Sequence, residues 1–372
     1  MKWEYGRRRR GKGHRRLILL VILLLAALVV AAYVLMRSGM LPQPWSATRA
    51  VPGEGGDKAA EARTSQQDEY VESQFLMNTY VSIRAFGAGA QAAVGAAFDE
   101  MRRVEGLMSR FVPTSDISRV NQAAGADPVR VSDETFMLLE KAQECSQLSG
   151  GAFDITIGPV VDAWGFGTDS PHVPDQGALA KATALVNFRA VGLDPVAKTA
   201  RLAVPGMSID LGGIAKGYAG DRAAAVLREH GVEHALIDAG GNIVAVGTRP
   251  DGSPWHIGIR DPRGTSPTDT IGPVVEVRDR AVVTSGDYER FFMEGRRRYH
   301  HIFDPKTGMP ATRAESATVI ARDSLDADML STAIFVLGPV EGMKMLERLD
   351  GVAGMVVGAD GKMTFSPGYP GR

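Results

Sequence analysis

The fold is centred on the stretch Asp210-Leu-Gly-Gly-Ile-Ala-Lys-Gly-Tyr-Ala-Gly-Asp221. This stretch follows an apolar segment, residues 203–209, and leads into a helical run, residues 218–229, so a strand is expected to become a helix here. At such a junction glycines let backbone N–H groups approach a ligand, the helix N-terminus favours anions, and Lys216 adds a positive charge. The pattern is typical of a phosphate-binding turn, or of a tight turn in which glycine only relieves steric strain.

The composition indicates a globular protein. The chain has 372 residues, of which 44% are hydrophobic and 23% are charged, with a formal net charge of −1. It contains 43 glycines and 20 prolines, which favour many turns over long helices. These values exclude a disordered chain.

The N-terminus predicts a membrane anchor. Eight lysines and arginines lie in the first sixteen residues, and residues 17–36 are apolar and uncharged. A basic tail can bind nucleic acid, but next to such a run it is typical of the cytoplasmic flank of a transmembrane helix. We therefore expect residues 1–16 in the cytoplasm, residues 17–36 as a single-pass anchor in the inner membrane of a bacterium, and the remaining chain on the periplasmic side. A cleaved signal peptide is the alternative.

Cysteine usage and local composition predict which covalent links are possible and where the linker and the folded domain lie. Cys145 is the sole cysteine, so intramolecular disulfides and cysteine-based metal clusters are excluded. Residues 37–72 are rich in proline, glycine and polar side chains, which predicts a flexible linker. Residues 73–372 then form one folded domain.

The pattern along the domain predicts an α+β fold with mixed sheets and packed helices, because strand and helix signals alternate irregularly. A polar loop is expected at residues 110–121 and an irregular break at Gly240-Gly241. Expected strands cover residues 75–83, 234–246, 255–260 and 274–284, and a hairpin covers 354–365. Expected helices cover 90–108, 326–337 and 340–349, with another that Asp133 caps and that ends at Gly150-Gly151.

Seven motifs follow one another along the chain. They are SRFVPTSDISRVN, GGAFDITIGP, DLGGIAKGYAGD, IDAGGNIVAVG, TSGDYERFF, HHIFDPKTGMP and DADMLSTA. Together and in this order they resemble the ApbE family. The resemblance extends from about Phe75 to the C-terminus. It implies an FAD:protein FMN transferase, which uses Mg²⁺ to cleave FAD, attaches FMN through a phosphoester to a threonine of a target flavoprotein, and releases AMP.

The resemblance also implies roles for individual residues. The flavin nucleotide would be contacted by Met77 and Phe111, lined by Ala152, Phe153 and Asp154, held by Asp210 and Lys216, and flanked by His301 and Ile302. His301 and Asp210 would serve catalysis, and Mg²⁺ would be bound by Asp328, Thr332 and a backbone oxygen near Gly213.

Several of these residues also have a structural interpretation. Asp154 is equally typical of a buried turn cap. His301 has an imidazole that ordinarily titrates near neutral pH, but it could instead hold the turn that begins at Asp304. Asp328 and Thr332 are spaced i, i+4, so they share one side of a helix and offer the oxygen ligands that Mg²⁺ prefers.

Two departures from the family pattern stand out. The family often has glycine where this chain has Asn78, and many relatives are lipoproteins, whereas this chain has an apolar N-terminal segment.

Two other functions remain open from the sequence. One is a Mg²⁺-dependent FAD pyrophosphatase, with water in place of the threonine, and the other is a membrane-tethered flavin carrier without catalysis. The family's usual acceptors are exported electron-transfer proteins, including subunits of redox-driven ion pumps. No nucleic-acid partner is expected.

Overall fold

The centre of the fold is an eight-stranded sheet. The structure is a computed structural model that describes residues 69–266 and 268–371. The strand order is β1-β2-β6-β7-β10-β13-β14-β15, and all neighbouring strands are antiparallel. The strands are β1 (Glu69–Leu76), β2 (Thr79–Phe86), β6 (His234–Ala239), β7 (Asn242–Val246), β10 (Ala281–Gly286), β13 (Ala314–Ala321), β14 (Ala353–Gly358) and β15 (Met363–Phe365).

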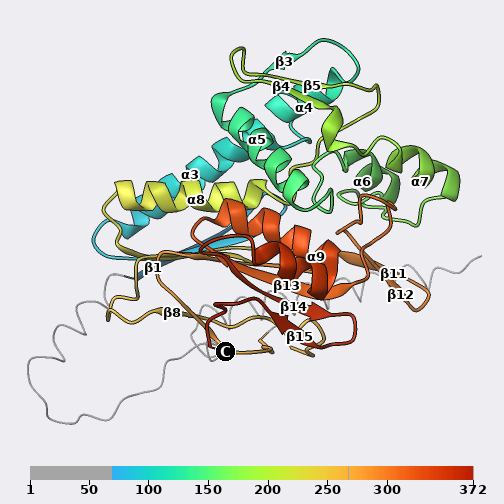
Figure 1. Ribbon diagram of the computed structural model, residues 1–372. Coiled ribbons are helices and arrows are strands. Elements are labelled where there is room, and N and C mark those ends of the chain that lie inside the picture. Colours follow the sequence, from blue (N-terminus) through green and yellow to red (C-terminus); the bar gives the residue numbers. More distant parts are fainter. Residues whose placement is uncertain (1–68, 267, 372) are drawn as a thin grey trace, which may run out of the picture. The chain divides into compact units, whose positions relative to one another are not determined.

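Three long helices cover one face of this sheet (Figure 1). They are α3 (Ala90–Met108), α8 (Ala215–Glu229) and α9 (Ser324–Leu346). Side chains alternate between the two faces of a strand. Accordingly Val283 and Val319 join the core beneath the helices, whereas Val282 and Ile320 face the other side. There they pack with a two-stranded sheet of β8 (Trp255–Ile257) and β9 (Val275–Val277).

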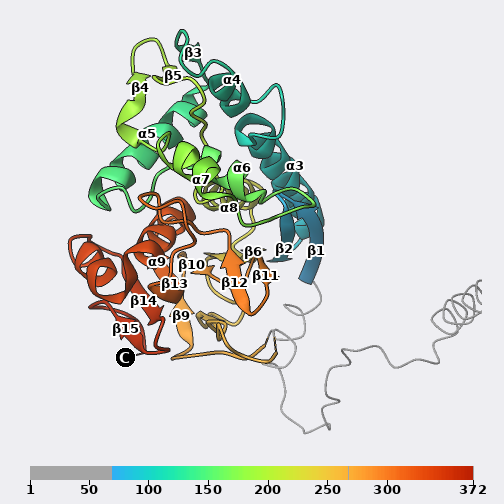
Figure 2. The same ribbon diagram turned by 90° about the vertical axis from the view of Figure 1, so that its right-hand side faces the viewer.

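The remaining elements form a smaller layer above the helices and beside the sheet (Figures 1 and 2). The β11–β12 hairpin packs its aromatic side chains against Trp164 of α6. The elements are α4 (Asp116–Gln122), α5 (Asp133–Leu148), α6 (Gly158–Trp164), α7 (Gln176–Thr183), the 3-10 helix η1 (Phe188–Ala190), β3 (Val129–Arg130), β4 (Val191–Asp194), β5 (Thr199–Leu202), β11 (Phe291–Glu294) and β12 (Arg297–His300).

This arrangement confirms the α+β class. The expected mixed sheets combine antiparallel with parallel pairing. Among the described residues the parallel pairing is one isolated bridge between Ile157 and Ser208. Strand β1 begins at Glu69, ahead of the boundary expected at residue 73, so the expected linker ends too late. The expected cytoplasmic tail, residues 1–16, and anchor, residues 17–36, lie outside the described residues.

The single strand expected at residues 75–83 is wrong. These residues belong to the β1–β2 hairpin, in which Met77 and Asn78 form the turn with φ of 52° and 59°. A two-residue turn with both residues in the left-handed region matches the right-handed twist of the flanking strands. Asparagine tolerates that region better than most residues, which explains how Asn78 replaces the usual glycine.

Three further expectations are wrong. The polar loop at 110–121 contains helix α4, which Ser115 caps by accepting from the Ser118 N–H. Residues 274–284 form two strands, β9 and β10, because Asp279 turns the chain with φ of 43°. Residues 203–209 form no strand beyond the bridge at Ser208.

Two helix starts also differ from expectation. Helix α8 begins at Ala215 rather than at residue 218. The cap of α5 is Ser132, whose side chain accepts from the Thr135 N–H, and Asp133 lies in the first turn.

The one strand expected at residues 234–246 is likewise two antiparallel strands, β6 and β7. The expected break at Gly240 and Gly241, with φ of 64° and 93°, is the turn between them. Gly338, with φ of 77°, divides α9 into the two expected helical parts. Among the described helices α9 alone is long and apolar enough to cross a membrane, but 67% of its most apolar window is buried in the domain. It is the core helix of the fold.

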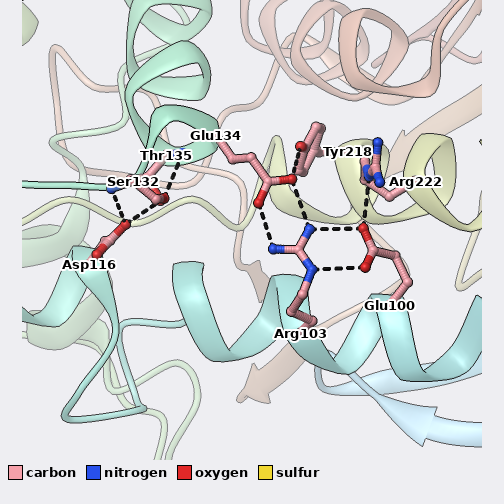
Figure 3. Close-up of polar contacts among 8 residues, drawn as sticks. All are labelled: Glu100, Arg103, Asp116, Ser132, Glu134, Thr135, Tyr218 and Arg222. Atoms are coloured by element: carbon pink, nitrogen blue, oxygen red, sulfur yellow. Dashed lines mark hydrogen bonds and ion pairs between the residues drawn. The ribbon is translucent and has the colours of Figure 1, made fainter. Parts of the chain in front are cut away.

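A polar network ties α8 to α3 and α5 (Figure 3). Arg103 of α3 pairs with Glu100 of the same helix and with Glu134 of α5. From α8, the Tyr218 hydroxyl donates to Glu134 at 2.6 Å and Arg222 donates to Glu100 at 2.8 Å. The bonds from Arg103 are the main cause that lowers the pKa of Glu100 to about 2. The network therefore fixes the helix that begins at the Asp210 loop.

Candidate active site

One cavity of about 310 Å³ lies where the β1–β2 turn, the start of α8, helix α9 and the β10–β11 loop meet. It brings together every site residue that the sequence predicted. They are Met77, Phe111, Ala152, Phe153, Asp154, Asp210, Gly213, Lys216, His301, Ile302, Asp328 and Thr332.

The loop before α8 is held by charge. One oxygen of Asp210 accepts from the Gly212 N–H at 2.8 Å, and the other lies 3.1 Å from Arg110. Arg110 also binds Asp162 of α6 at 2.6 Å. The carboxylate of Asp210 thus closes its own loop and joins it to the residues that follow α3.

The start of α8 binds a carboxylate of the protein itself. The Gly217 N–H donates to Asp328 at 2.9 Å, and Lys216 lies 3.4 Å from the same carboxylate. A Cβ atom at position 217 would lie 2.3 Å from the Ser324 carbonyl oxygen, so only glycine allows α9 to approach this closely. Asp328 is 2% exposed, so these partners compensate its buried charge.

The expected metal ligands converge on one part of the cavity. Asp328 and Thr332 lie on α9, and both line the cavity. A Cβ atom on Gly213 would lie 3.3 Å from the Thr332 hydroxyl, so the glycine backbone passes close to that oxygen. Ser285 adds a second hydroxyl, 3.3 Å from Thr332. One carboxylate and nearby hydroxyl and backbone oxygens suit Mg²⁺, which in phosphate sites takes the remaining ligands from water and substrate.

His301 lies at the end of β12 and faces the cavity. Its Nδ1 lies 3.2 Å from the Arg290 carbonyl oxygen. A carbonyl only accepts hydrogen bonds, so Nδ1 carries the hydrogen and Nε2 is left with a lone pair. This bond is to Arg290 and not to the turn at Asp304, which is closed by its own backbone bonds to Thr307 and Gly308.

The surroundings of His301 shift the pKa of its imidazole. Burial, and then the positive charge of Arg290, lower the pKa of His301 to about 3. The neighbouring His300 points away from the cavity, as expected for the next residue in a strand. Its Nε2 donates to the Ala311 carbonyl oxygen at 2.9 Å.

Asp154 has the contacts of a buried turn cap. Its carboxylate accepts from the N–H of Thr156 at 2.8 Å, from the Thr156 hydroxyl at 2.6 Å and from the N–H of Phe188 at 2.9 Å. Burial raises its pKa in spite of these bonds. These bonds fix the loop that carries Ala152 and Phe153 to the cavity.

The β1–β2 turn forms another wall. The Met77 N–H donates to Glu105 of α3 at 3.1 Å, and the Asn78 carbonyl accepts from Arg290 at 2.8 Å. Both bonds hold a turn in which Met77 has an uncommon positive φ.

Sequence reasoning did not single out several lining residues. Arg110 lies in the motif SRFVPTSDISRVN, and Ser285, Glu289 and Arg290 lie in TSGDYERFF. For Glu289 and Arg290 a signal was available. These two adjacent charged residues lie between Gly286, where β10 ends, and the two phenylalanines that open β11.

Two proteins that share one name are similar to this chain in sequence. A protein named FAD:protein FMN transferase from Treponema pallidum (strain Nichols) is 38% identical over 322 residues, which cover 82% of this chain and 88% of that protein. A protein of the same name from Klebsiella pneumoniae (strain 342) is 35% identical and covers 77% of this chain and 89% of its own length.

Solved structures have the same fold. The ApbE protein of Thermotoga maritima superposes with a TM-score of 0.74 at 33% identity, covering 80% of this chain and 97% of that chain. The flavin transferase ApbE from Vibrio cholerae gives 0.71 at 30% identity, covering 81% and 97%. The family model of the ApbE family matches residues 77–356, a range that contains every residue of the cavity. The chain belongs to the ApbE family.

Proposed function

We propose that this protein transfers FMN from FAD to the hydroxyl of a threonine in an acceptor flavoprotein, with Mg²⁺, and releases AMP. Its family and the flavin transferases that it resembles support the activity. The observation that carries the proposal is one cavity that holds an oxygen-donor pair and an imidazole with a free lone pair.

In this reaction the threonine oxygen forms a bond to the phosphorus of the FMN half. The bond from that phosphorus to the bridging oxygen breaks, and the electron pair leaves with AMP. The hydroxyl proton passes to Nε2 of His301, whose lone pair is left available by the Nδ1 bond. The Nδ1–H bond to the Arg290 carbonyl holds the ring in the tautomer that this transfer needs.

Asp328, Thr332 and a backbone oxygen near Gly213 would bind Mg²⁺. When bound, Mg²⁺ neutralises negative charge on phosphate oxygens in phosphoryl transfer. Lys216 is held 3.4 Å from Asp328 and contributes a further positive charge to the same part of the cavity. Because phosphate oxygens would complete the ligand set, we expect FAD and Mg²⁺ to bind cooperatively.

The test is to incubate the purified full-length chain with FAD, Mg²⁺ and a candidate acceptor, and to measure AMP and the mass of the acceptor. AMP together with an acceptor heavier by one FMN supports transfer. AMP without a heavier acceptor would refute transfer and favour the pyrophosphatase. The absence of both products would favour a flavin carrier. A threonine-to-valine acceptor controls for the site of attachment.

We further propose that residues 17–36 anchor the chain in the inner membrane of a bacterium, with the domain on the periplasmic side and exported electron-transfer proteins as acceptors. The support is the basic cluster before the apolar run and the lone Arg37 immediately after it. Protease added to spheroplasts should digest the domain, whereas protection until lysis would contradict this topology.

A further inference from the structure

The cations of the cavity differ in their ion pairs. Arg110 pairs with Asp162 and Asp210, and Lys216 pairs with Asp328. Within residues 69–266 and 268–371, no carboxylate oxygen lies within 4.0 Å of a side-chain nitrogen of Arg290. Its positive charge is therefore the one most available to an anion that enters the cavity.

Arg290 is nevertheless fixed in place at both ends. Its Nη2 donates to the Asn78 carbonyl at 2.8 Å, and its own carbonyl accepts from the His301 N–H at 3.1 Å and from His301 Nδ1 at 3.2 Å. A guanidinium has five N–H groups in a planar fork. The bond to Asn78 uses one of them and orients the plane, so ordering Arg290 around a ligand costs little further side-chain entropy.

The electrostatics of this region favour an anion. The charge of Arg290 is the second cause, after burial, that lowers the pKa of His301, so the guanidinium field reaches the imidazole. Burial lowers the pKa of Arg290 itself, whereas Asp210 and Glu289 act on it in the opposite direction. A partly desolvated cation gains from an anionic partner, and guanidinium binds two phosphate oxygens through parallel N–H bonds.

We propose that the guanidinium of Arg290 binds phosphate oxygens of the dinucleotide beside His301, separately from the Asp328–Thr332 pair. This rests on the proposed function in that FAD is the dinucleotide. Arg290 then has two tasks, since its carbonyl orients the imidazole and its side chain neutralises the phosphate next to it.

The competing explanation is that Arg290 only supports the β1–β2 turn through Asn78. Comparing FAD with riboflavin in Arg290→Gln separates the two. This variant removes the charge and, because its side chain is two atoms shorter, also the donor to the Asn78 carbonyl, and loss of turn support alone would weaken both ligands equally. Arg290→Lys keeps the charge and loses the planar fork. Arg296→Gln is the matched control, since Arg296 is exposed on the β11–β12 turn and does not line the cavity.

The experiment measures the dissociation constants of the full-length chain for FAD and for riboflavin, which has no phosphate, without Mg²⁺, by flavin fluorescence. We expect Arg290→Gln to weaken FAD binding about 10- to 100-fold, Arg290→Lys to weaken it less, and neither to change riboflavin binding. Increasing salt should weaken FAD binding to the wild type more than to Arg290→Gln.

Unchanged FAD affinity in Arg290→Gln would overturn the proposal, and so would equal losses for FAD and riboflavin. The transfer assay is independent of this result. A wild-type chain that binds FAD through Arg290 but modifies no acceptor would refute the proposed function and leave the phosphate contact intact.

Discussion

Gly217→Ala should separate helices α8 and α9. The new Cβ atom would lie 2.3 Å from the Ser324 carbonyl oxygen and 2.8 Å from the Asp328 Cβ. Neither is the end of a flexible side chain, so no rotamer change relieves the overlap. The α9 backbone would have to retreat by roughly 1 Å to restore ordinary contact.

The magnitude follows from three effects. Overpacking costs about 1–3 kcal/mol. The retreat also lengthens the 2.9 Å bond from the Gly217 N–H to Asp328, and a bond to a charged group contributes about 1.5–3 kcal/mol. Alanine's higher helix propensity offsets about 1 kcal/mol. We therefore expect the free energy of unfolding to fall by about 1.5–5 kcal/mol, and Tm by roughly 2–8 °C.

Urea unfolding of the full-length chain, followed by circular dichroism, measures this loss. The matched control is Gly95→Ala in the middle of α3, where a Cβ atom meets nothing within 4 Å. That variant should gain about 0.5–1 kcal/mol from helix propensity alone. The steric reasoning fails if Gly217→Ala unfolds at the wild-type urea midpoint or is stabilised as the control is.

Four further outcomes are expected. Tyr218→Phe removes the hydroxyl that binds Glu134, and should lower the free energy of unfolding by about 0.5–1.5 kcal/mol in urea titrations without changing the FAD dissociation constant. Glu100 has a pKa lowered from 4.5 to about 2, so its stabilisation is present above pH 4.5 and is lost as the pH falls toward 2. Glu100→Gln should therefore show a shallower loss of stability between pH 4 and 2, and equal slopes would count against the network. Because the pKa of His301 is about 3, kcat/KM should have no step between pH 5 and 7 from this residue. A step in the wild type that disappears in His301→Gln would contradict a neutral imidazole. Asp328→Ala should abolish AMP release while circular dichroism stays native, and wild-type turnover across a Mg²⁺ titration would exclude the metal site.

Many of the residues that line the cavity could be predicted from the sequence because they lie in ordered motifs. Most contacts among them could not, since these depend on partners far along the chain. Gly217 illustrates this, because the glycines of its stretch could have offered their N–H groups to a ligand, whereas the Gly217 N–H donates to Asp328, over a hundred residues away. Arg290 was overlooked for the same reason, as its importance comes from Asn78 and His301 together.

Fold prediction failed mainly at turns inside apolar runs. The β1–β2 turn lies between two strong strand patterns, and Asn78 was the sole indication that the chain reverses there. The short helix α4 was hidden because its stabilisation comes from a Ser115 cap and from the bond of Asp116 to Ser132, rather than from a long apolar face.

The position of β1 has a mechanical consequence. This edge strand pairs with β2 alone in the main sheet, through eight successive residue pairs that end at the turn bordering the cavity. A force that pulls β1 along its own axis would load these pairs in shear, so that many hydrogen bonds resist together before the turn at Met77 moves. Tension on the preceding chain would therefore be absorbed along the strand, and the wall of the cavity would keep its shape while the protein is pulled.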